Sequence, residues 1–377
     1  MGFKNYLNEL KNYESGKPIE LVVREFGIYE DDVIKLASNE NALGVAKSVA
    51  KAIKKEAKNA FRYPDDSAYE LKEALAKKFS IYPQNIILGS GSDQIIDILI
   101  HAVCGKGDKI LTSAVTFAMY EIYAKQCEAS VVRTKGEIFN ADEIIALAKT
   151  HKPKIIFLCV PNNPLGDCLS RDEVYRILDS VDKDCIVALD CAYNEFAKFK
   201  DKSKGISPHE LIATYPNALY LGTFSKLYGL GGLRVGYGIA IDSTIATLSK
   251  LRPPFNNTNI SLKAALTALK DKKFIEKTLD NNAKQMKTYE KFAKENGIRF
   301  IESYTNFITL FFEKNIDSTA LCDYLLKNGI IIRNLKSYNL NAVRITIGLE
   351  KENKQVLKYI AKFLNKVAEK NGNKAKD

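Results

Sequence analysis

Seven short apolar runs alternate with amphipathic stretches between about residues 84 and 240. In the intervening stretches, apolar residues recur at three- and four-residue spacing, which predicts helices that bury one face. Strands that alternate with helices usually pair in parallel, so this order indicates a largely parallel sheet covered by helices. The seven expected strands are NIILG, KILT, SVVRT, KIIFLCV, CIVALD, ALYLGT and VGYGIA.

The alternation breaks at LRPPFNNTN, residues 251–259, where paired prolines and polar residues favour a boundary. Beyond it, the sequence predicts long helices at about residues 260–297 and a closing helix from about residue 351. The strand-like runs FITLFF, GIIIRN and AVRITIG lie between these helices. We therefore expect an N-terminal arm at residues 1–35, a large domain at 36–255 and a smaller α+β domain at 256–377.

Chain length and charge narrow the class of protein. A chain of 377 residues exceeds the usual size of a single core, which agrees with two packed domains. The formal net charge is +11, but the excess lysines are spread along the chain and often lie near glutamates at helical spacing. A nucleic-acid surface clusters its charge or mixes it with aromatics. We expect a solvated surface that attracts anionic cofactors and substrates, and no nucleic-acid partner.

Cysteine and histidine usage gives no sign of disulfides or of a metal centre. The seven cysteines include no CxxC pair and mostly lie in apolar stretches, which is typical of free thiols in a reducing cytoplasm. The three histidines lie too far apart for metal-ligand spacing, so no metal is expected. The N-terminus lacks the apolar run of a signal peptide, and no stretch is long enough to span a bilayer. This predicts a cytoplasmic protein without a membrane partner.

A lysine directly after a buried strand is the first candidate for chemistry. The run ALYLGT ends in Thr223; Ser225 and Lys226 follow at once, and Arg234 lies eight residues further on. Partial desolvation and a neighbouring cation would lower the pKa of this amine, as imine chemistry requires. The hydroxyls and Arg234 could hold a phosphate dianion. The alternative is a lysine that extends to solvent beside a glycine-rich turn.

Two further candidates follow other strands in the same way. Asp190 ends the run CIVALD, and ligands of open α/β sheets bind beyond such strand ends. A carboxylate there can pair with a pyridine nitrogen and keep it protonated, while Tyr193 can reach an oxygen of the same ring. Asn163, in the polar turn after KIIFLCV, can donate to a cofactor oxygen. A helix cap or an ordinary turn is the alternative role at Asp190 and Asn163.

A glycine-rich loop joins the run NIILG to the next helix. Gly89 and Gly91 permit close approach of a ligand, and the helix N-terminus favours a phosphate near Ser92 and Asp93. The loop is similar to a dinucleotide fingerprint, which leaves a nicotinamide-dependent oxidoreductase as an alternative. However, Gln94 occupies the third glycine position, and the next strand offers no acidic residue to bind a ribose.

The order of these motifs along successive strands resembles that of fold-type I, class II pyridoxal-phosphate-dependent aminotransferases, and specifically the histidinol-phosphate aminotransferase family. The resemblance runs from about YESGKPIE to AVRITIG and includes VTFAMY around Phe117 and FRYPDD around Tyr63. The chain departs from the family pattern at Ala42, at Cys191 and in GLEKEN after Arg344. The family usually carries proline, an acidic residue and GT at these positions.

The resemblance implies a role for each candidate. Lys226 would form a Schiff base with pyridoxal 5'-phosphate, and Asp190 and Tyr193 would complete the catalytic set by binding the pyridine nitrogen and the ring oxygen. Tyr63 would reach the cofactor phosphate of a neighbouring subunit, which makes a homodimer the functional unit. The other cofactor contacts would be Asn163 at the ring oxygen, Phe117 on the ring face, and Ser92, Asp93, Thr223, Ser225 and Arg234 around the phosphate. On the substrate side, Arg344 would bind a carboxylate, Arg333 a distal phosphate, and Asn39 would also be a contact.

The implied activity moves an amino group between glutamate or 2-oxoglutarate and a phosphate-bearing substrate by a ping-pong mechanism. The expected substrate pair is histidinol phosphate and imidazole acetol phosphate, in histidine biosynthesis. A relative that aminates another phosphorylated ketone, such as dihydroxyacetone phosphate, is an alternative, as is a decarboxylase of a phosphorylated amino acid. A non-catalytic, ligand-binding regulator of the same fold is the alternative from a different class.

Overall fold

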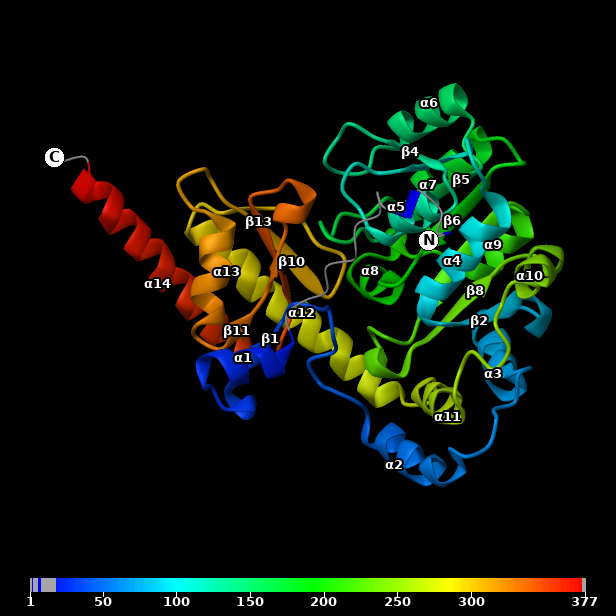
Figure 1. Ribbon diagram of the computed structural model, residues 1–377, viewed down its shortest axis with the longest axis horizontal. Helices are drawn as coiled ribbons and strands as arrows, with labels where there is room; N and C mark the ends of the chain where they lie inside the picture. Colours follow the sequence, from blue (N-terminus) through cyan, green and yellow to red (C-terminus); the bar gives the residue numbers. More distant parts are fainter. Residues whose placement is uncertain (1, 3–5, 8–17, 375–377) are drawn as a thin grey trace.

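The structure is a computed structural model, and it describes residues 2, 6–7 and 18–374. Figure 1 shows two α/β bodies beside each other, with the long helix α12 (Lys272–Glu295) running between them. Within the predicted N-terminal arm, residues 1, 3–5 and 8–17 lie outside the described residues.

The larger body is built on a seven-stranded sheet with the strand order β2-β8-β7-β6-β5-β3-β4. Only β8 runs antiparallel to its neighbours, so the predicted mostly parallel sheet of seven strands is confirmed. Each of the seven apolar runs forms one of these strands. They are β2 (Ile86–Ser90), β3 (Lys109–Thr112), β4 (Ser130–Arg133), β5 (Ile155–Cys159), β6 (Ile186–Asp190), β7 (Ala218–Thr223) and β8 (Val235–Ile239).

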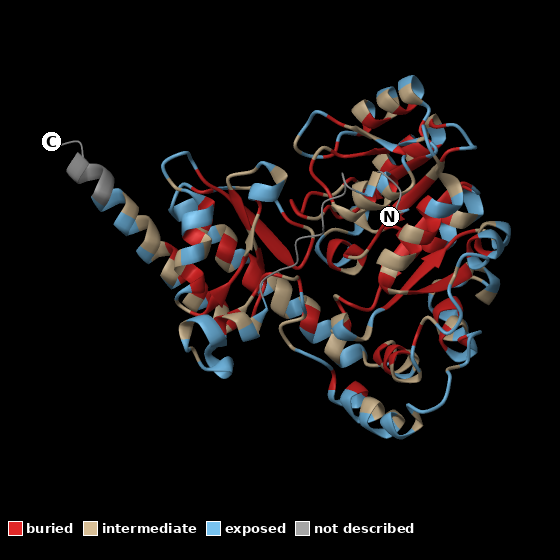
Figure 2. Cartoon of the chain, in the orientation of Figure 1, coloured by how far each residue is buried: buried red, intermediate tan, exposed pale blue. Residues whose placement is uncertain are grey.

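Helices pack against this sheet or against one another, and their apolar faces join its strands in one large hydrophobic cluster. Figure 2 shows the strands as buried and the outer helices with one exposed face, which is the burial expected from their spacing of apolar residues. The helices are α2 (Lys47–Glu56), α3 (Tyr69–Phe79), α4 (Gly91–Val103), α5 (Met119–Gln126), α6 (Ala141–His151), α7 (Arg171–Ser180), α8 (Asn194–Lys200), α9 (Pro208–Thr214), α10 (Asp242–Ser249) and α11 (Asn259–Ala268).

The smaller body combines the antiparallel sheet β12-β13-β10-β9 with a separate parallel pair, β1-β11. The run GIIIRN, expected as one strand, is divided between them: Ile330 pairs with Ile34, whereas Arg333 pairs with Arg344. The elements are α1 (Ile19–Phe26), β1 (Ile34–Lys35), β9 (Arg299–Phe300), β10 (Phe307–Phe311), α13 (Ser318–Leu326), β11 (Ile330–Ile331), β12 (Arg333–Asn334), β13 (Ala342–Thr346) and α14 (Glu350–Lys374). Short 3-10 helices are η2 (Glu30–Asp32), η3 (Ala57–Asn59), η4 (Pro83–Asn85), η5 (Lys202–Lys204), η6 (Gly231–Leu233) and η7 (Lys336–Tyr338).

The division into an arm, a large domain and a smaller domain stays a prediction, and the hydrophobic clusters divide the chain at other points. Ala264 and Ala265 of α11 belong to the cluster of the large sheet, although they lie after the predicted boundary at residue 255. Helix α12 contributes Phe274 to that cluster and Tyr289 to the cluster of the smaller body. The proline-rich segment therefore forms a loop within the larger body. The chain passes from the larger hydrophobic core to the smaller one along α12.

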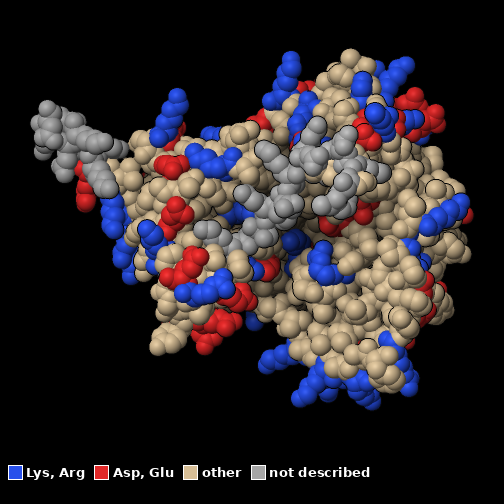
Figure 3. All heavy atoms as spheres, viewed as in Figure 1, with Lys and Arg blue, Asp and Glu red and all other residues tan. Residues whose placement is uncertain are grey.

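The surface mixes both signs of charge. In Figure 3, basic and acidic side chains alternate over much of the visible face, and basic ones gather at its lower edge, where Figure 1 places α2. That helix and the residues after it expose Lys47, Lys51, Lys54, Lys55 and Lys58. Within residues 2, 6–7 and 18–374, no helix is long and apolar enough to cross a membrane, and no three His, Cys, Asp or Glu side chains gather as metal ligands.

Candidate active site

A cavity of about 310 Å³ lies between the carboxyl ends of the large sheet and the arginine-bearing strands of the smaller one. Every predicted site residue except Tyr63 lines it. The residues brought together are Asn39, Ser92, Asp93, Phe117, Asn163, Asp190, Tyr193, Thr223, Ser225, Lys226, Arg234, Arg333 and Arg344. The residues that follow the strands therefore line one common cavity, and their roles stay predictions.

The register of the parallel strands explains this convergence. Cys159 at the end of β5 lies opposite Asp190 at the end of β6, and Asp190 lies opposite Leu221 near the end of β7. Because parallel strands end at the same edge of a sheet, the residues that follow them meet above that edge. Asn163 and Lys226 reach the cavity from the loops after β5 and β7.

The amine of Lys226 lies in this cavity and is its candidate nucleophile. It donates to the backbone oxygen of Ser38 at 3.3 Å and lies 6.0 Å from the centre of the Tyr193 ring. Its pKa is lowered from 10.5 to about 8, first by burial and then by the cation of Arg344, while nearby carboxylates oppose the shift. A large fraction of the amine is therefore neutral, and able to attack a carbonyl carbon, in mildly alkaline solution.

Asp190 provides a buried carboxylate beneath the cavity. Only 5% of the residue is exposed, and its oxygens accept hydrogen bonds from the Tyr120 hydroxyl at 2.8 Å and from the Ala192 N–H at 3.3 Å. Burial raises the pKa of Asp190, while the Tyr120 hydrogen bond opposes this by stabilising the ionised form. The fully buried Tyr120 ring is stacked on Phe157, with centroids 4.4 Å apart. Tyr120 thus positions Asp190.

Arg234, two hydroxyls and two glycines form a cradle at one end of the cavity. The Ser225 hydroxyl lies 3.0 Å from that of Thr223 and 3.4 Å from Nη1 of Arg234. A side chain at Gly91 would collide with the Arg234 guanidinium, and one at Gly236 would collide with the Ser92 backbone. The glycines let the start of α4, with its unpaired N–H groups, approach the arginine. This donor set fits a phosphate dianion.

The Asp93 carboxyl is directed toward a different partner. One of its oxygens accepts from the Tyr123 hydroxyl at 2.9 Å, and burial raises the pKa of the group. A carboxylate repels a phosphate, so we expect Asp93 to contribute its backbone N–H, in the first turn of α4, rather than its side chain.

Two arginines lie opposite each other on adjacent strands of the smaller sheet. Arg333 of β12 lies directly opposite Arg344 of β13, and both line the cavity. Arg344 donates to Asn163 Oδ1 at 2.5 Å and to the Ala37 backbone oxygen at 2.7 Å. The Arg333 side chain makes no hydrogen bond or ion pair with any residue that the structure describes. Like charges directly opposite each other are destabilising, so this pair favours an anionic ligand.

The segment after β1 closes the cavity around Asn39. Its side chain donates to the Tyr193 hydroxyl at 2.8 Å, and its N–H donates to the Thr346 hydroxyl at 2.9 Å. Asn306 donates to the Asn39 backbone oxygen at 3.1 Å. Sequence reasoning missed the supporting roles of Thr346, Asn306 and Tyr120. Only Tyr120 carried a usable signal, because it lies three residues after Phe117 in the predicted site motif.

Tyr63 lies outside the cavity. It is 82% exposed, and its ring packs against that of Phe255 with centroids 4.8 Å apart. An exposed aromatic pair is compatible with a contact to a second chain, and the expected role of Tyr63 at a neighbouring subunit stays a prediction.

Comparisons with known proteins agree on one family. The family described as "Aminotransferase class I and II" matches residues 31–360. The chain is 56% identical to the histidinol-phosphate aminotransferase of Campylobacter hominis, over 97% of this chain and 100% of that protein. It is 51% identical to that of Wolinella succinogenes, with the same two coverages. Its fold is similar to the histidinol-phosphate aminotransferase of Sinorhizobium meliloti in complex with pyridoxal-5'-phosphate, with a TM-score of 0.88, 24% identity and coverage of 97% and 98%.

The environment of Lys226 predicts its titration in the protein without any ligand. Its amine should become reactive with a midpoint near pH 8, and Arg344→Gln should raise that midpoint because a neighbouring cation is lost. The measurement is the rate of amine modification at this lysine against pH, followed by peptide mapping, with the exposed Lys263 as internal reference. An unchanged midpoint in Arg344→Gln would show that this arginine does not influence the amine.

Tyr120→Phe should destabilise the protein by about 1.5–3 kcal/mol at neutral pH, because a hydrogen bond to a buried charged group is lost. Folding raises the pKa of Asp190 above its ordinary value of 3.8. The free energy of unfolding therefore falls as pH rises from 3.8 to the pKa of Asp190 in the folded protein. The variant lacks the bond that stabilises the ionised form, so its deficit should shrink on acidification. Urea unfolding at several pH values tests this.

Tyr289→Phe is the matched control for Tyr120→Phe. Tyr289 is also fully buried, but its hydroxyl donates to the neutral side chain of Asn353, at 3.0 Å. Its loss should cost only about 1 kcal/mol, with no dependence on the ionisation of Asp190. Equal deficits in the two variants at every pH would contradict the role of Tyr120.

Proposed function

The chain belongs to the class I and II aminotransferase family, and we propose that it exchanges amino groups between glutamate and histidinol phosphate. The corresponding keto compounds are 2-oxoglutarate and imidazole acetol phosphate. The observation that carries this proposal is the opposed pair Arg333 and Arg344 beside a lysine of lowered pKa. Both amino compounds are anionic, through carboxylates or a phosphate, and either can relieve the repulsion between the arginines.

Pyridoxal 5'-phosphate is the proposed cofactor, and the residues of the cavity fit it. The cradle of Arg234, Ser225 and backbone N–H groups suits its phosphate, and the buried carboxylate of Asp190 suits a protonated pyridine nitrogen. The amine of Lys226 suits its aldehyde. When bound, this cofactor supplies an electron sink that makes the α-hydrogen of an amino acid acidic.

The protein's own groups divide the remaining work. Nζ of Lys226 would take up the proton from the α-carbon of the substrate and deliver it to the carbon that carried the cofactor's aldehyde, a role that suits a pKa close to the working pH. Tyr193 accepts a hydrogen bond from Asn39, which leaves its own hydrogen available for an oxygen of the ligand. Arg344 orients a carboxylate, and Arg333 binds the distal phosphate of histidinol phosphate.

A homodimer is the proposed functional unit. Tyr63 is exposed outside the cavity of its own chain, where a second chain could receive it. A cytoplasmic location is also proposed, because none of the seven cysteines, which all lie within the described residues 18–374, forms a disulfide, as is usual in a reducing compartment.

The cofactor and the substrate can be tested together. Added pyridoxal 5'-phosphate should give a yellow protein, and borohydride reduction should fix the cofactor at Lys226 in a peptide map. A panel of histidinol phosphate, small phosphorylated amines and aromatic amino acids should show the highest kcat/KM for histidinol phosphate with 2-oxoglutarate. No adduct at Lys226 would overturn the proposal, and preference for another phosphorylated amine would replace the substrate.

Arg333→Ala should separate the two half-reactions. The kcat/KM for histidinol phosphate should fall about ten- to a hundredfold, the size of a lost charge-assisted hydrogen bond, while reaction with glutamate is largely kept. Lys336→Ala is the matched control, because Lys336 pairs with Asp317 at 3.1 Å and does not line the cavity. Equal loss for both substrates in Arg333→Ala would contradict the assigned role.

A further inference from the structure

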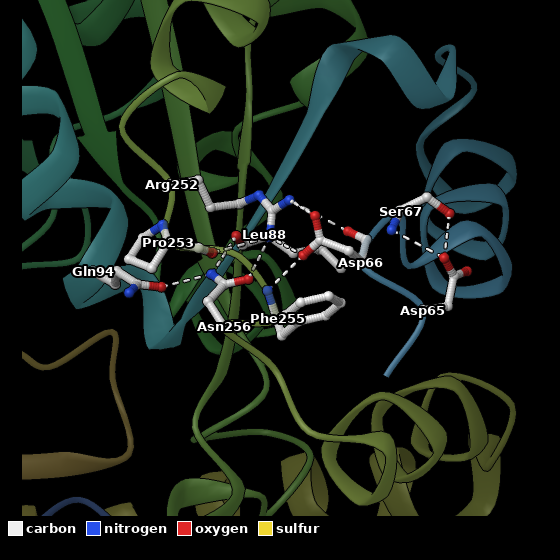
Figure 4. Close-up of polar contacts among 9 residues, drawn as sticks. All are labelled: Asp65, Asp66, Ser67, Leu88, Gln94, Arg252, Pro253, Phe255 and Asn256. Carbon is white, nitrogen blue, oxygen red and sulfur yellow. Dashed lines mark hydrogen bonds and ion pairs between the residues drawn. The ribbon is translucent and has the colours of Figure 1, made fainter. Parts of the chain in front are cut away.

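A polar cluster joins two distant segments of the chain on the face where Tyr63 is exposed. Figure 4 shows Asp66, from the loop before α3, facing Arg252, Phe255 and Asn256, from the segment between α10 and α11. Asp66 and Arg252 are 186 residues apart in the sequence. Neither residue lines the active-site cavity.

Asp66 holds this second segment by three strong hydrogen bonds. The Arg252 guanidinium binds it through both nitrogens, with Nη1–Oδ1 at 2.9 Å and Nη2–Oδ2 at 2.6 Å, and the Phe255 N–H donates to Oδ1 at 2.6 Å. The bonds from Arg252 and Phe255 lower the pKa of Asp66 to about 2. The pair therefore stays ionised throughout the neutral range, and its fork geometry fixes the relative position of the two segments.

The outer end of the cluster carries an aromatic pair. Tyr63, three residues before Asp66, packs on the ring of Phe255, and the two residues are 82% and 44% exposed. Phe255 has a φ of +56°, a conformation that costs energy for a residue with a side chain. Its bond to Asp66 stabilises this conformation. Asp66 thus holds the backbone of Phe255, and the Tyr63 ring packs on the Phe255 ring.

The inner end of the cluster reaches the phosphate cradle. Arg252 donates to Asn256 Oδ1 at 2.8 Å, and Asn256 donates to Gln94 Oε1 at 2.7 Å. That same Gln94 oxygen accepts from the Ser90 N–H at 2.8 Å, directly before Gly91. The buried Asn257 donates to the backbone oxygens of Gly89 and Arg234, at 3.1 and 3.2 Å.

We propose that Asp66 and Arg252 are positioning residues for the cofactor phosphate. Their ion pair, which we call the clamp, holds Tyr63 in place for the phosphate site of a second subunit. Through Asn256 and Asn257, the clamp also steadies the cradle of its own subunit. This inference rests on the proposed function, since it assumes pyridoxal 5'-phosphate in the cradle and Tyr63 acting between subunits.

Asp66→Asn should weaken the binding of pyridoxal 5'-phosphate about tenfold, the equivalent of about 1.4 kcal/mol. The full-length protein, freed of cofactor, is titrated with pyridoxal 5'-phosphate and followed by absorbance. Arg252→Lys keeps the charge and one ionic bond, so its loss of affinity should be smaller than that of Arg252→Gln. Glu70→Gln is the matched control: it removes an exposed partner of Lys263 between α3 and α11 and should leave the affinity unchanged.

A double-mutant cycle separates positioning from general stability. If Asp66 acts through Tyr63, Asp66→Asn should cost less affinity in a Tyr63→Phe background than in the parent, whereas independent effects add. The inference is overturned if Asp66→Asn binds the cofactor as Glu70→Gln does, and its link through Tyr63 is overturned if the two effects are fully additive. A parent protein that forms no cofactor adduct at Lys226 would instead overturn the proposed function, so the two failures are distinguishable.

Discussion

The site depends on the crowding of cations into one cavity. Lys226 lies within the field of Arg234 and Arg344, and Arg333 faces Arg344 across the strand pair. Placing these four cationic side chains together costs free energy when no anion is bound, because desolvation and mutual repulsion both disfavour the charged forms. The amine responds by losing its proton more easily, and the arginines, which cannot, remain as sites for anionic groups. Reactivity and anion recognition therefore have the same electrostatic origin.

The seven-stranded sheet and the four-stranded sheet hold these cations in a fixed geometry. The parallel sheet contributes Lys226 and Arg234 from its strand ends, together with the carboxylate of Asp190, and a glycine-lined approach lets α4 reach Arg234. The antiparallel sheet contributes Arg333 and Arg344 from adjacent strands. In the proposed function, the cofactor side of the cavity is therefore on one sheet and the substrate side on the other. A change of substrate on this scaffold would require few changes in the large sheet.

Residues at strand ends were predictable because their position follows from local pattern alone. An apolar run locates the strand, and parallel pairing brings the next polar residue to the shared edge, which is where Asp190 and Lys226 line the cavity. Contacts between remote segments carry no such pattern. The support of Asn39 by Asn306, the change of partner within GIIIRN and the place of α11 in the large core all depend on pairings that no local periodicity encodes.

The phosphate cradle is supported from two directions, and in the proposed homodimer this links cofactor binding to subunit association. From inside, Gly91 and Gly236 allow the start of α4 to approach Arg234. From outside, the clamp connects the same loop to the face that carries Tyr63. If a residue of one subunit contacts the phosphate bound by another, dimerisation must strengthen cofactor binding, and the cofactor must strengthen the dimer by the same factor. The ion pair between Asp66 and Arg252 would then influence both equilibria without touching either ligand.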